Sequence, residues 1–448
     1  MSAIENIFKA YDVRGKVGTE LTPEVVTKIG RAYADWLPNE GAVAVGRDMR
    51  PDSKELAAAL IEGLCQQGRD VIDIGEVTSD MIYFATGKLG LAGGVVITAS
   101  HNPGAYNGIK FCREEAKPVG EESGLYEVRD KVLADEFATP LKTGAVTQKD
   151  VVEAWITHVL SFIDPSELEP LHLAVDAGNG MAGKIFPELE PYVPFQVEEL
   201  YFELDGTFPN HIANPLEPKN LVDVQAAIKK HGCDAGVAFD GDGDRAVLLD
   251  EKGELVTGTV LTALLAEYFL KLNPGATILH NAICGRAAVE AIKNAGGKPV
   301  RTRVGHSFIK GEMRKNNAVF AGEHSGHYYF KDNYMADSGL IAAVIGLYIL
   351  SISGKKLSEL AAPYRKAYVQ ISETNFEVED KQAMLDKIAT EFEDGESDTL
   401  DGLTVNFPNG WFNVRPSNTE PLLRLNAEAK TKAELDELVT KVTALITS

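Results

Sequence analysis

Residues 52–98, DSKELAAALIEGLCQQGRDVIDIGEVTSDMIYFATGKLGLAGGVVIT, decide the fold class of the N-terminal part of the chain. Residues 52–68 have apolar side chains at helical spacing, an Asp-x-x-Glu capping signal from Asp52 to Glu55, and Gly68 at the end, which predict a helix. The runs DVIDIG and GGVVIT are rich in β-branched residues and bounded by glycine, as is typical of buried parallel strands. The stretch therefore predicts a βαβ unit.

The same alternation returns twice farther along the chain. In the first repeat, the strand-like run LHLAVD is followed by a helix and then by the runs DAGVAF and AVLLD. In the second repeat, the run ATILHN is followed by a helix over about 286–295 and then by the run KPVRTRV. These units predict three α/β domains in series. Each domain ends a strand at a loop rich in Gly, Asn, His or Asp, and open α/β sheets bind ligands at such carboxyl ends.

From about residue 369 the pattern changes to that of a smaller domain. YVQISETNFEV, LTVNFP, WFNVRPS and PLLRLNAEA resemble strands, and helices are predicted over 381–393 and 432–446. We therefore expect three tandem mixed α/β sandwich domains (1–150, 151–253 and 254–368) and a C-terminal α+β domain (369–448) with a largely antiparallel sheet. The acidic stretch over 391–398 is expected to be a solvated face.

Composition excludes several classes of partner. The net charge of −22 over 448 residues argues against nucleic acid or an anionic membrane as a partner, although a small anionic substrate remains possible. The four cysteines lie far apart and form no C-x-x-C pair, so no zinc knuckle is predicted. With no leader and no long apolar run, we expect a cytoplasmic protein.

Alternating carboxylates and glycines give the strongest local signal, at Asp240-Gly241-Asp242-Gly243-Asp244-Arg245. The glycines let the backbone curl, so that three carboxylates converge on one hard cation, for which Mg²⁺ fits best. An EF-hand is the first alternative, because Glu251 falls at the twelfth position. It fails because Arg245 replaces the glycine at the sixth position and the flanks resemble strands. A solvated acidic turn is the second alternative.

A serine follows the predicted strand GGVVIT in Thr98-Ala99-Ser100-His101-Asn102-Pro103. A hydroxyl at a strand end beside an imidazole is a possible nucleophile. A plain Asn-Pro turn is the alternative, and the lack of a G-x-S-x-G elbow gives no support to a hydrolase triad.

Two later loops offer groups that bind sugars and phosphates. Gly322-Glu323-His324-Ser325-Gly326-His327 suits sugar hydroxyls; a metal site is the alternative, but the H-E-x-x-H spacing is absent. Residues 415–421, RPSNTEP, offer a guanidinium, hydroxyls, an amide and backbone N–H groups, which match a phosphate.

A glycine-rich segment over 178–183, GNGMAG, could be mistaken for a nucleotide site. It satisfies G-x-G-x-x-G after a strand, with Glu198 and Glu199 near the distance of the usual ribose ligand. Read as a P-loop ending at Lys184, it has Ile185 where a Ser or Thr must bind Mg²⁺. A tight strand-to-helix turn is the favoured interpretation.

Taken together, these loops resemble the α-D-phosphohexomutase family, in its phosphomannomutase/phosphoglucomutase branch. The resemblance covers nearly the whole chain and rests on FKAYDVRG, TASHNP, DGDGDR, VGHSFIK, GEHSGH and RPSNTEP in this order. It implies four domains around a central cleft and interconversion of hexose 1- and 6-phosphates through a hexose 1,6-bisphosphate, which also acts as activator. The expected partners are small hexose phosphates, with a monomer or weak dimer as the assembly.

The resemblance also implies roles for individual residues. Ser100 would carry the phosphoryl group and, with three aspartates, bind Mg²⁺ (Asp240, Asp242 and Asp244). The sugar hydroxyls would be bound by the loop of Glu323, Ser325 and His327. Four residues would hold the non-reacting phosphate (Arg415, Ser417, Asn418 and Thr419). Others would surround the transferring group, with Lys110 or His306 as proton carrier (Tyr11, Arg14, His101, Asn102, Lys110, Arg245 and His306).

Some alternatives stay open at this point. GEHSGH and RPSNTEP differ from the GEQSGH and RPSGTEP typical of phosphoglucosamine mutases, which favours mannose and glucose phosphates over glucosamine phosphate. Some relatives carry a lysine where this chain has residues 281–284, NAIC, and Arg286 is expected to substitute for it. A metal-dependent sugar-phosphate phosphatase and a noncatalytic sensor are the other classes. The sensor is disfavoured because Ser100 and the carboxylates are intact.

Overall fold

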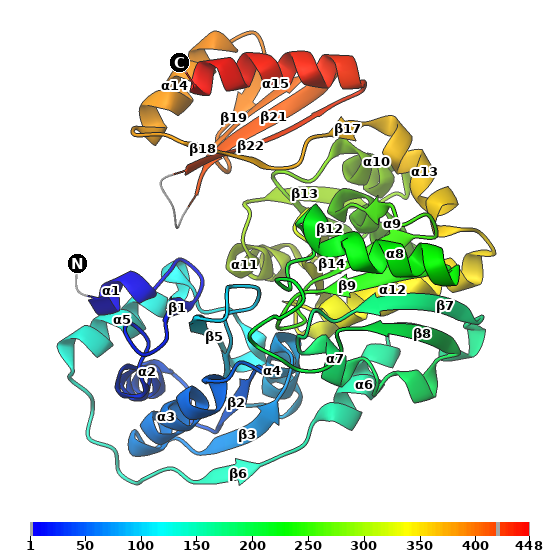
Figure 1. Ribbon diagram of the computed structural model, residues 1–448. Coiled ribbons are helices and arrows are strands. Elements are labelled where there is room, and N and C mark those ends of the chain that lie inside the picture. The colour runs from blue at the N-terminus through cyan, green and yellow to red at the C-terminus, as the bar shows by residue number, and fades with distance from the viewer. Residues whose placement is uncertain (1–2, 418–421, 448) are drawn as a thin grey trace. The chain divides into compact units, whose positions relative to one another are not determined.

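The computed structural model describes residues 3–417 and 422–447 (Figure 1). Its chain forms two compact units, of which the first comprises Met1–Thr257 and Ser325–Ser358 and the second Gly258–His324 and Glu359–Ser448. The division into four domains that the sequence predicts is finer than these two units and stays a prediction.

The predicted βαβ unit is present in the first unit. Helix α3 (Ser53–Gln66) lies between β2 (Val43–Arg47) and β3 (Val71–Glu76), and β2 pairs in parallel with both β3 and β4 (Gly93–Ile97). The predicted capping box is wrong: Asp52 makes no side-chain cap hydrogen bond, because its backbone is already helical at φ −89° and ψ −11° instead of extended.

Helix α2 (Pro23–Trp36) packs closely on α3, as Figure 1 shows. A Cβ placed on Gly63 would lie 2.1 Å from the Thr27 carbonyl oxygen, so only glycine permits this approach of the two backbones. The apolar face of this helix pair covers the sheet, and residues such as Ile29, Leu60 and Val45 form its core.

The first sheet has the order β1-β5-β4-β2-β3-β6 and is mixed. Strands β1 (Val13–Lys16) and β5 (Tyr106–Arg113) are antiparallel, as are β5 and β4, whereas β6 (Val146–Gln148) runs parallel to β3. The remaining helices of this region are α1 (Ala3–Ile7), α4 (Ser79–Lys88) and α5 (Leu125–Ala134). Ser100 lies in the connection between β4 and β5, and Lys110 lies on β5 opposite Val96.

The second sheet has the order β11-β10-β9-β7-β8. Strand β7 (Leu171–Asp176) is parallel to β8 (Phe195–Leu200) and β9 (Ala235–Phe239), while β9 and β10 (Ala246–Asp250) form an antiparallel hairpin that continues to β11 (Leu255–Val256). Helices α6 (Val152–Leu160), α7 (Ala182–Ile185) and α8 (Val222–His231) belong to this region. The acidic residues 240–244 form the hairpin loop between β9 and β10.

The segment 325–358 completes the first unit. Strand β15 (Tyr328–Phe330) pairs antiparallel with β16 (Ala336–Asp337), and α12 (Gly339–Ser353) follows. Most of the α12 side chains are buried in the protein. Within residues 3–417 and 422–447, no single helix is long and apolar enough to cross a membrane; α12 and α13 (Leu357–Ala367) meet that test only together, across a bend.

In the second unit, β12 (Thr277–Asn281) is parallel to β13 (Lys298–Thr302) and β14 (Phe320–Gly322). Helices α9 (Gly258–Leu272), α10 (Arg286–Asn294) and α11 (His306–Asn316) accompany these strands. The predicted strand, helix and strand over 276–304 are therefore confirmed. Short 3-10 turns occur elsewhere in the chain at Glu114–Ala116, Glu121–Ser123, Pro165–Glu167, Glu190–Tyr192, Pro218–Leu221 and Lys331–Asn333.

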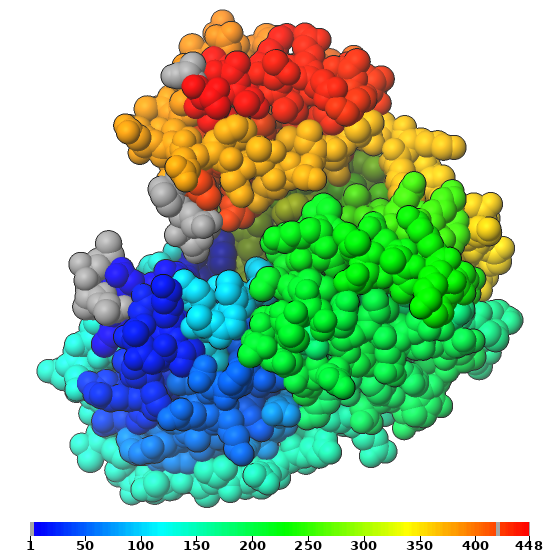
Figure 2. All heavy atoms as spheres, in the orientation of Figure 1, coloured from blue at the N-terminus to red at the C-terminus, as the bar shows by residue number. Residues whose placement is uncertain are grey.

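The C-terminal sheet is antiparallel, as predicted. Its order is β17-β22-β21-β20-β19, with β18 also paired to β22, and the strands are β17 (Val369–Gln370), β18 (Thr374–Glu377), β19 (Glu396–Asp398), β20 (Leu403–Phe407), β21 (Gly410–Pro416) and β22 (Leu422–Ala429). Helices α14 (Lys381–Glu391) and α15 (Lys432–Ile446) bury apolar residues against it. The opposite face of α15 lies at the surface, where Figure 2 shows it in red.

Candidate active site

Ser100 occupies a strained position at the end of β4. Its backbone φ is +49°, a value that non-glycine residues rarely adopt. The Thr98 hydroxyl accepts a hydrogen bond from the Ser100 N–H at 2.8 Å and so stabilises this conformation. Strained residues of this kind cluster at sites where the surrounding structure fixes a functional group. A plain Asn-Pro turn, the alternative interpretation, does not account for this geometry.

The acidic hairpin meets Ser100 inside the first unit. The Ser100 hydroxyl donates a hydrogen bond to Asp240 Oδ2 at 2.7 Å, across 140 residues of sequence. Asp240, Asp242 and Asp244 are all buried, and a carboxylate oxygen of each lies within 4.8 Å of one from each of the others. The solvated acidic turn is therefore excluded as an interpretation of this loop.

Lys110 lies between two of these carboxylates. Its Nζ donates to Asp242 Oδ2 and to Asp244 Oδ2, each at 2.6 Å, from the middle of β5. Burial alone would lower the pKa of Lys110, but Asp242 and Asp244 outweigh this effect and raise it. The ammonium thus supplies one of the positive charges that the three buried carboxylates require.

The remaining carboxylate oxygens fit a metal ion. Asp242 Oδ1 and Asp244 Oδ1 are buried and have no hydrogen-bond partner among the residues that the structure describes. Burial raises the pKa of Asp240 to about 7, with Asp242 and Asp244 adding to the rise. An all-oxygen donor set with unsatisfied charge suits a hard divalent cation.

Two cations flank the serine on its other sides. Arg245 Nε donates to Asp240 Oδ2 at 2.9 Å, and its guanidinium also bonds His101 Nδ1, which lies 3.0 Å from Ser100 Oγ. Burial, together with Arg245 and Arg14, lowers the pKa of His101 well below its usual range. Arg14 bonds Asn102 Oδ1 at 3.0 Å and the Ala99 carbonyl. The structure therefore brings these residues around Ser100, as expected from the sequence.

Arg50 is a site residue that the sequence analysis missed. Its buried guanidinium donates to four carbonyl oxygens of the serine loop, those of Ser100, Asn102, Pro103 and Tyr106, at 2.5 to 3.1 Å. Asp48 Oδ2 lies 3.3 Å from its Nε. The burial of this charged pair, which is rare for arginine and aspartate, becomes visible only in the structure, so the sequence alone carries no signal for it.

We predict that Arg50→Lys lowers kcat by roughly 10- to 100-fold while KM changes by less than about 3-fold, because lysine cannot donate to four carbonyls as the planar guanidinium does. Steady-state kinetics of the variant check this, with thermal unfolding to establish that it is folded. Arg129→Lys, which changes a partly buried arginine that pairs with Asp130 and lies over the Tyr126 ring, is the matched control and should behave as wild type. An unchanged kcat would contradict a positioning role.

Ser79 holds the acidic hairpin from the side of α4. Its hydroxyl donates to Asp242 Oδ2 at 2.5 Å and its N–H donates to the Asp242 carbonyl at 3.0 Å. The next residue, Asp80, is buried and accepts hydrogen bonds from the Ser338 hydroxyl at 2.5 Å and from the Thr78 hydroxyl. Burial raises the pKa of Asp80 to about 8, and Asp244 and Asp337 contribute to the rise.

This shifted pKa predicts a pH-dependent stability. A carboxyl whose pKa is raised by folding stabilises the protein most below its unfolded pKa of about 4, and this contribution is lost as pH rises toward 8. Asp80→Asn, which stays neutral, should therefore raise Tm in metal-free buffer, by at least about 2 °C more at pH 8 than at pH 5. Calorimetry at the two pH values measures this. The same change in Tm at both would contradict the prediction.

The glycine-rich turn over 178–183 has a structural role. The Met181 N–H donates to the Gly241 carbonyl at 2.9 Å, and a Cβ on Gly180 would lie 2.8 Å from that oxygen. The turn thus packs on the acidic hairpin and leads into α7. This confirms the favoured interpretation as a strand-to-helix turn and explains why glycine is needed there.

The loop over 322–327 is divided between the two units. In the second unit, Glu323 is buried, and Asn281 Nδ2 donates to it at 3.1 Å. In the first unit, Ser325 Oγ lies 3.1 Å from His327 Nδ1, and His327 Nε2 lies 3.6 Å from Asp244 Oδ1. His327 thus belongs to the Ser100 region, whereas the position of Glu323 against Ser100 stays a prediction.

The Arg286 side chain has different contacts from those expected. Its guanidinium donates to the carbonyls of Phe407 at 2.8 Å and Gly410 at 3.0 Å, so it stabilises the turn between β20 and β21 instead of substituting for a lysine. His306 begins α11 in the second unit, and Tyr11 lies partly buried in the bend before β1. The parts of these two residues in the reaction also stay predictions.

A second arginine, which the sequence analysis did not single out, lies on the strand that follows the predicted phosphate loop. Arg415 and Arg424 lie opposite each other on β21 and β22 and bind the two oxygens of Glu373 at 2.9 and 3.1 Å. Burial alone would raise the pKa of Glu373, but the two arginines outweigh this effect and lower the pKa. Ser417 lies 3.4 Å from Arg424. Asn418 and Thr419 lie outside the described residues.

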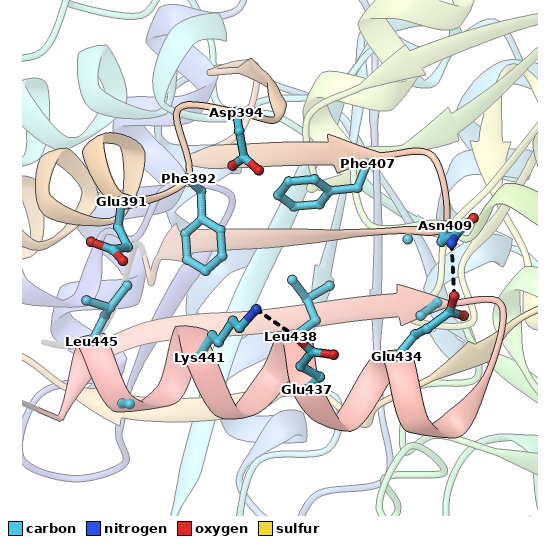
Figure 3. Close-up of a pocket in the computed structure, with 13 residues that line it drawn as sticks. Glu391, Phe392, Asp394, Phe407, Asn409, Glu434, Glu437, Leu438, Lys441 and Leu445 are labelled. Atoms are coloured by element: carbon cyan, nitrogen blue, oxygen red, sulfur yellow. Dashed lines mark hydrogen bonds and ion pairs between the residues drawn. The ribbon is translucent and has the colours of Figure 1, made fainter.

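A cavity of about 780 Å³ between α14, α15 and the C-terminal sheet is unsuited to a hexose phosphate (Figure 3). Phe392, Phe407 and Leu438 contribute apolar surface to it. Its rim carries carboxylates, those of Glu391, Asp394, Glu434 and Glu437, against the single cation Lys441. This acidic rim would repel a phosphate, whereas the surroundings of Ser100 and the Arg415–Arg424 pair offer cations.

Comparison with known proteins agrees with the fold. Profiles of Phosphoglucomutase/phosphomannomutase match the chain in order: alpha/beta/alpha domain I over residues 5–138, domain II over 153–253, domain III over 257–368 and the C-terminal domain over 373–445. The phosphohexose mutase of Xanthomonas campestris pv. campestris is 42% identical over 436 residues, which are 97% of each chain. Escherichia coli K12 phosphomannomutase is 39% identical over 443 residues, again 97% of each.

The fold of the chain also matches that of a solved structure. A phosphoglucomutase/phosphomannomutase family protein from Burkholderia thailandensis superposes with a TM-score of 0.91 at 34% identity, covering 99% of this chain and 97% of that one. The chain therefore belongs to the phosphoglucomutase/phosphomannomutase family. It is accordingly an enzyme of the isomerase class, a phosphohexomutase.

Proposed function

We propose that this enzyme interconverts hexose 1-phosphates and hexose 6-phosphates, with Ser100 as the carrier of the phosphoryl group. Glucose and mannose phosphates are the proposed substrates, because similar proteins are named for phosphomannomutase and phosphoglucomutase activity. Mg²⁺ is the proposed metal and a hexose 1,6-bisphosphate the proposed intermediate and activator. We also propose a cytoplasmic location and a monomer or weak dimer.

One observation carries the proposal: Ser100 Oγ lies 2.7 Å from Asp240 Oδ2 of the acidic hairpin. Lys110 and Arg245 bond carboxylates of that hairpin, and Arg14 bonds the loop of Ser100. A phosphoryl group on Ser100 would lie among a metal-binding carboxylate set and these cations. Phosphoryl transfer needs in-line positioning and neutralisation of the equatorial oxygens, which such surroundings provide. A bound Mg²⁺ would supply further neutralisation of that charge.

The first half-reaction forms a bond between phosphorus and a sugar hydroxyl oxygen and breaks the bond between phosphorus and Ser100 Oγ. The sugar hydroxyl loses a proton, for which His306 is the proposed carrier, because the raised pKa of Lys110 keeps it an ammonium that cannot accept one. The serine oxygen regains a proton, for which the Lys110 ammonium is the proposed donor. The resulting 1,6-bisphosphate reverses its orientation. Ser100 then takes the other phosphoryl group, so the sugar leaves as the isomeric monophosphate and the enzyme is again phosphorylated.

The remaining predicted residues would hold the sugar. We propose that Glu323, Ser325 and His327 bind hydroxyls that glucose and mannose share, and that Arg415 and Ser417, with Asn418 and Thr419, bind the phosphate that does not react. The Arg415–Glu373–Arg424 cluster supports this, because two guanidiniums that already bind one carboxylate are suited to a phosphate. Four domains around a central cleft, as the resemblance implies, would provide this arrangement.

Phosphorus NMR tests the proposed function directly. The protein is incubated with Mg²⁺, trace bisphosphate and glucose 1-phosphate, mannose 1-phosphate or glucosamine 1-phosphate in separate samples. We expect the 6-phosphate resonance to grow with the first two sugars and far more slowly with the third. Growth of the inorganic phosphate resonance instead would identify a sugar-phosphate phosphatase, and binding without conversion would identify a sensor.

A further inference from the structure

We propose that Asp244, His327 and Asp337 form a second divalent-cation site, which binds Zn²⁺ beside the acidic hairpin. One imidazole nitrogen and two carboxylate oxygens from these residues all lie within 4.8 Å of one another, inside the first unit. The site shares Asp244 with the proposed Mg²⁺ ligands but contains neither Asp240 nor Asp242.

A rigid hairpin positions two of the three ligands. His327 lies directly before β15 and Asp337 ends β16, and these strands pair with Tyr329 opposite Asp337. The Ala246 N–H donates to the Gly326 carbonyl at 3.4 Å, which attaches the hairpin to the strand that follows Asp244. Ligands on short paired strands keep their separation, so the site is formed before a metal arrives.

The side chains are oriented for coordination. Ser325 Oγ lies 3.1 Å from His327 Nδ1, so the serine oxygen can accept the Nδ1 proton and leave the Nε2 lone pair toward Asp244. Asp244 is 2% exposed, and its Oδ1 is a buried atom with no hydrogen-bond partner among the described residues. His327 Nε2 lies 3.6 Å from this Oδ1, too far for a hydrogen bond but suited to two ligands of one ion.

The donor set selects the metal. One imidazole and two carboxylates are a ligand combination that Zn²⁺ accepts with an open fourth position, whereas Mg²⁺ prefers oxygen ligands only. The His327 side chain is 20% exposed and offers a route of entry. The two clusters therefore favour different metals. The mixed cluster favours Zn²⁺, and the all-oxygen cluster of Asp240, Asp242 and Asp244 favours Mg²⁺.

Calorimetric titration of the full-length, metal-free protein with ZnCl₂ tests the site without requiring turnover. We expect His327→Gln and Asp337→Asn each to weaken one zinc-binding event by at least about 10-fold. Asp240→Asn, which alters only the proposed Mg²⁺ ligands, should change this event by less than about 3-fold. His211→Gln is the matched control, because His211 pairs with a single carboxylate, Asp176, at 3.1 Å.

If His327→Gln binds zinc with wild-type affinity, the proposal is overturned. It is also overturned if Asp240→Asn loses as much zinc affinity as His327→Gln, because the zinc would then bind at the acidic hairpin. His327 is partly exposed, so we expect His327→Gln to fold. The test therefore remains decisive even if Asp337→Asn does not fold. Since the two sites share Asp244, we also expect Zn²⁺ to inhibit turnover and raised Mg²⁺ to relieve the inhibition. This last expectation rests on the proposed function, whereas the binding measurement does not.

Discussion

Ser100→Ala should lower mutase turnover by at least about 10⁴-fold, because it removes the atom that carries the phosphoryl group in both half-reactions. No other hydroxyl is expected to replace it. Ser79, the other serine bonded to the hairpin, uses its hydroxyl and its N–H to hold Asp242. Coupled enzyme assays with glucose 1-phosphate and with mannose 1-phosphate measure the loss. Intact-mass analysis after incubation with glucose 1,6-bisphosphate should show one added phosphate in the wild type and none in the variant.

The matched control is Ser166→Ala, which removes an exposed hydroxyl bonded only to its neighbour Asp164. This variant should retain wild-type turnover and the added phosphate. The Ser100→Ala protein should keep the wild-type Tm within a few degrees, because its hydroxyl is held by a hydrogen bond to Asp240 and a contact with His101 and by little else in the described part of the chain. Substantial turnover by folded Ser100→Ala would remove the serine from the mechanism.

Asp242→Asn should lower kcat by roughly 10² to 10³-fold at saturating substrate and raise the Mg²⁺ concentration required for half-maximal rate. The substitution keeps the shape of the side chain but removes its charge. Asp242 Oδ1 is one of the buried oxygens without a hydrogen-bond partner in the described part of the chain, and Oδ2 binds Lys110 at 2.6 Å. The variant therefore loses charge toward both the metal and the ammonium.

Metal titration separates these two effects. If Asp242 acts through the metal, the rate of Asp242→Asn should recover partly at high Mg²⁺, whereas a defect that acts only through Lys110 should not depend on Mg²⁺. Asp205→Asn removes a partly buried carboxylate that bonds Thr207 and should match the wild type. Wild-type activity that survives exhaustive chelation with EDTA would contradict a metal role for the hairpin.

Local patterns predicted the elements of the fold well, because each was dictated by nearby residues. The final helix spans Lys432–Ile446 as predicted, since Thr431 and Glu434 form a capping box at its start. The prediction failed at the start of α3, where Asp52 and Glu55 have the spacing of a capping box but Asp52 has a helical backbone. A sequence motif gives the residues of a cap and not the φ and ψ angles on which the cap depends.

The site was predicted only where its residues lie in recognisable loops. Ser100 and the three aspartates lie in short motifs at strand ends, so the sequence could indicate them. Arg50, Ser79 and Arg424 lie outside such motifs. Their importance comes from contacts between distant segments, such as the hydrogen bond from Ser79 to Asp242 across 163 residues. Spacing within one segment carries no information about such contacts, and the burial of a charged side chain such as Arg50 is known only from the fold.

The central claim is that the phosphoryl group on Ser100 is the one that reaches the sugar. Wild-type protein is labelled at Ser100 with radioactive phosphate, freed of ligand and mixed with excess unlabelled glucose 1-phosphate and Mg²⁺, and the products are separated after less than one turnover and after many. We expect the label to appear first in glucose 1,6-bisphosphate and then in the hexose monophosphates, while inorganic phosphate stays unlabelled. Label that appears in inorganic phosphate, or that stays on the protein while glucose 6-phosphate accumulates, would contradict this account.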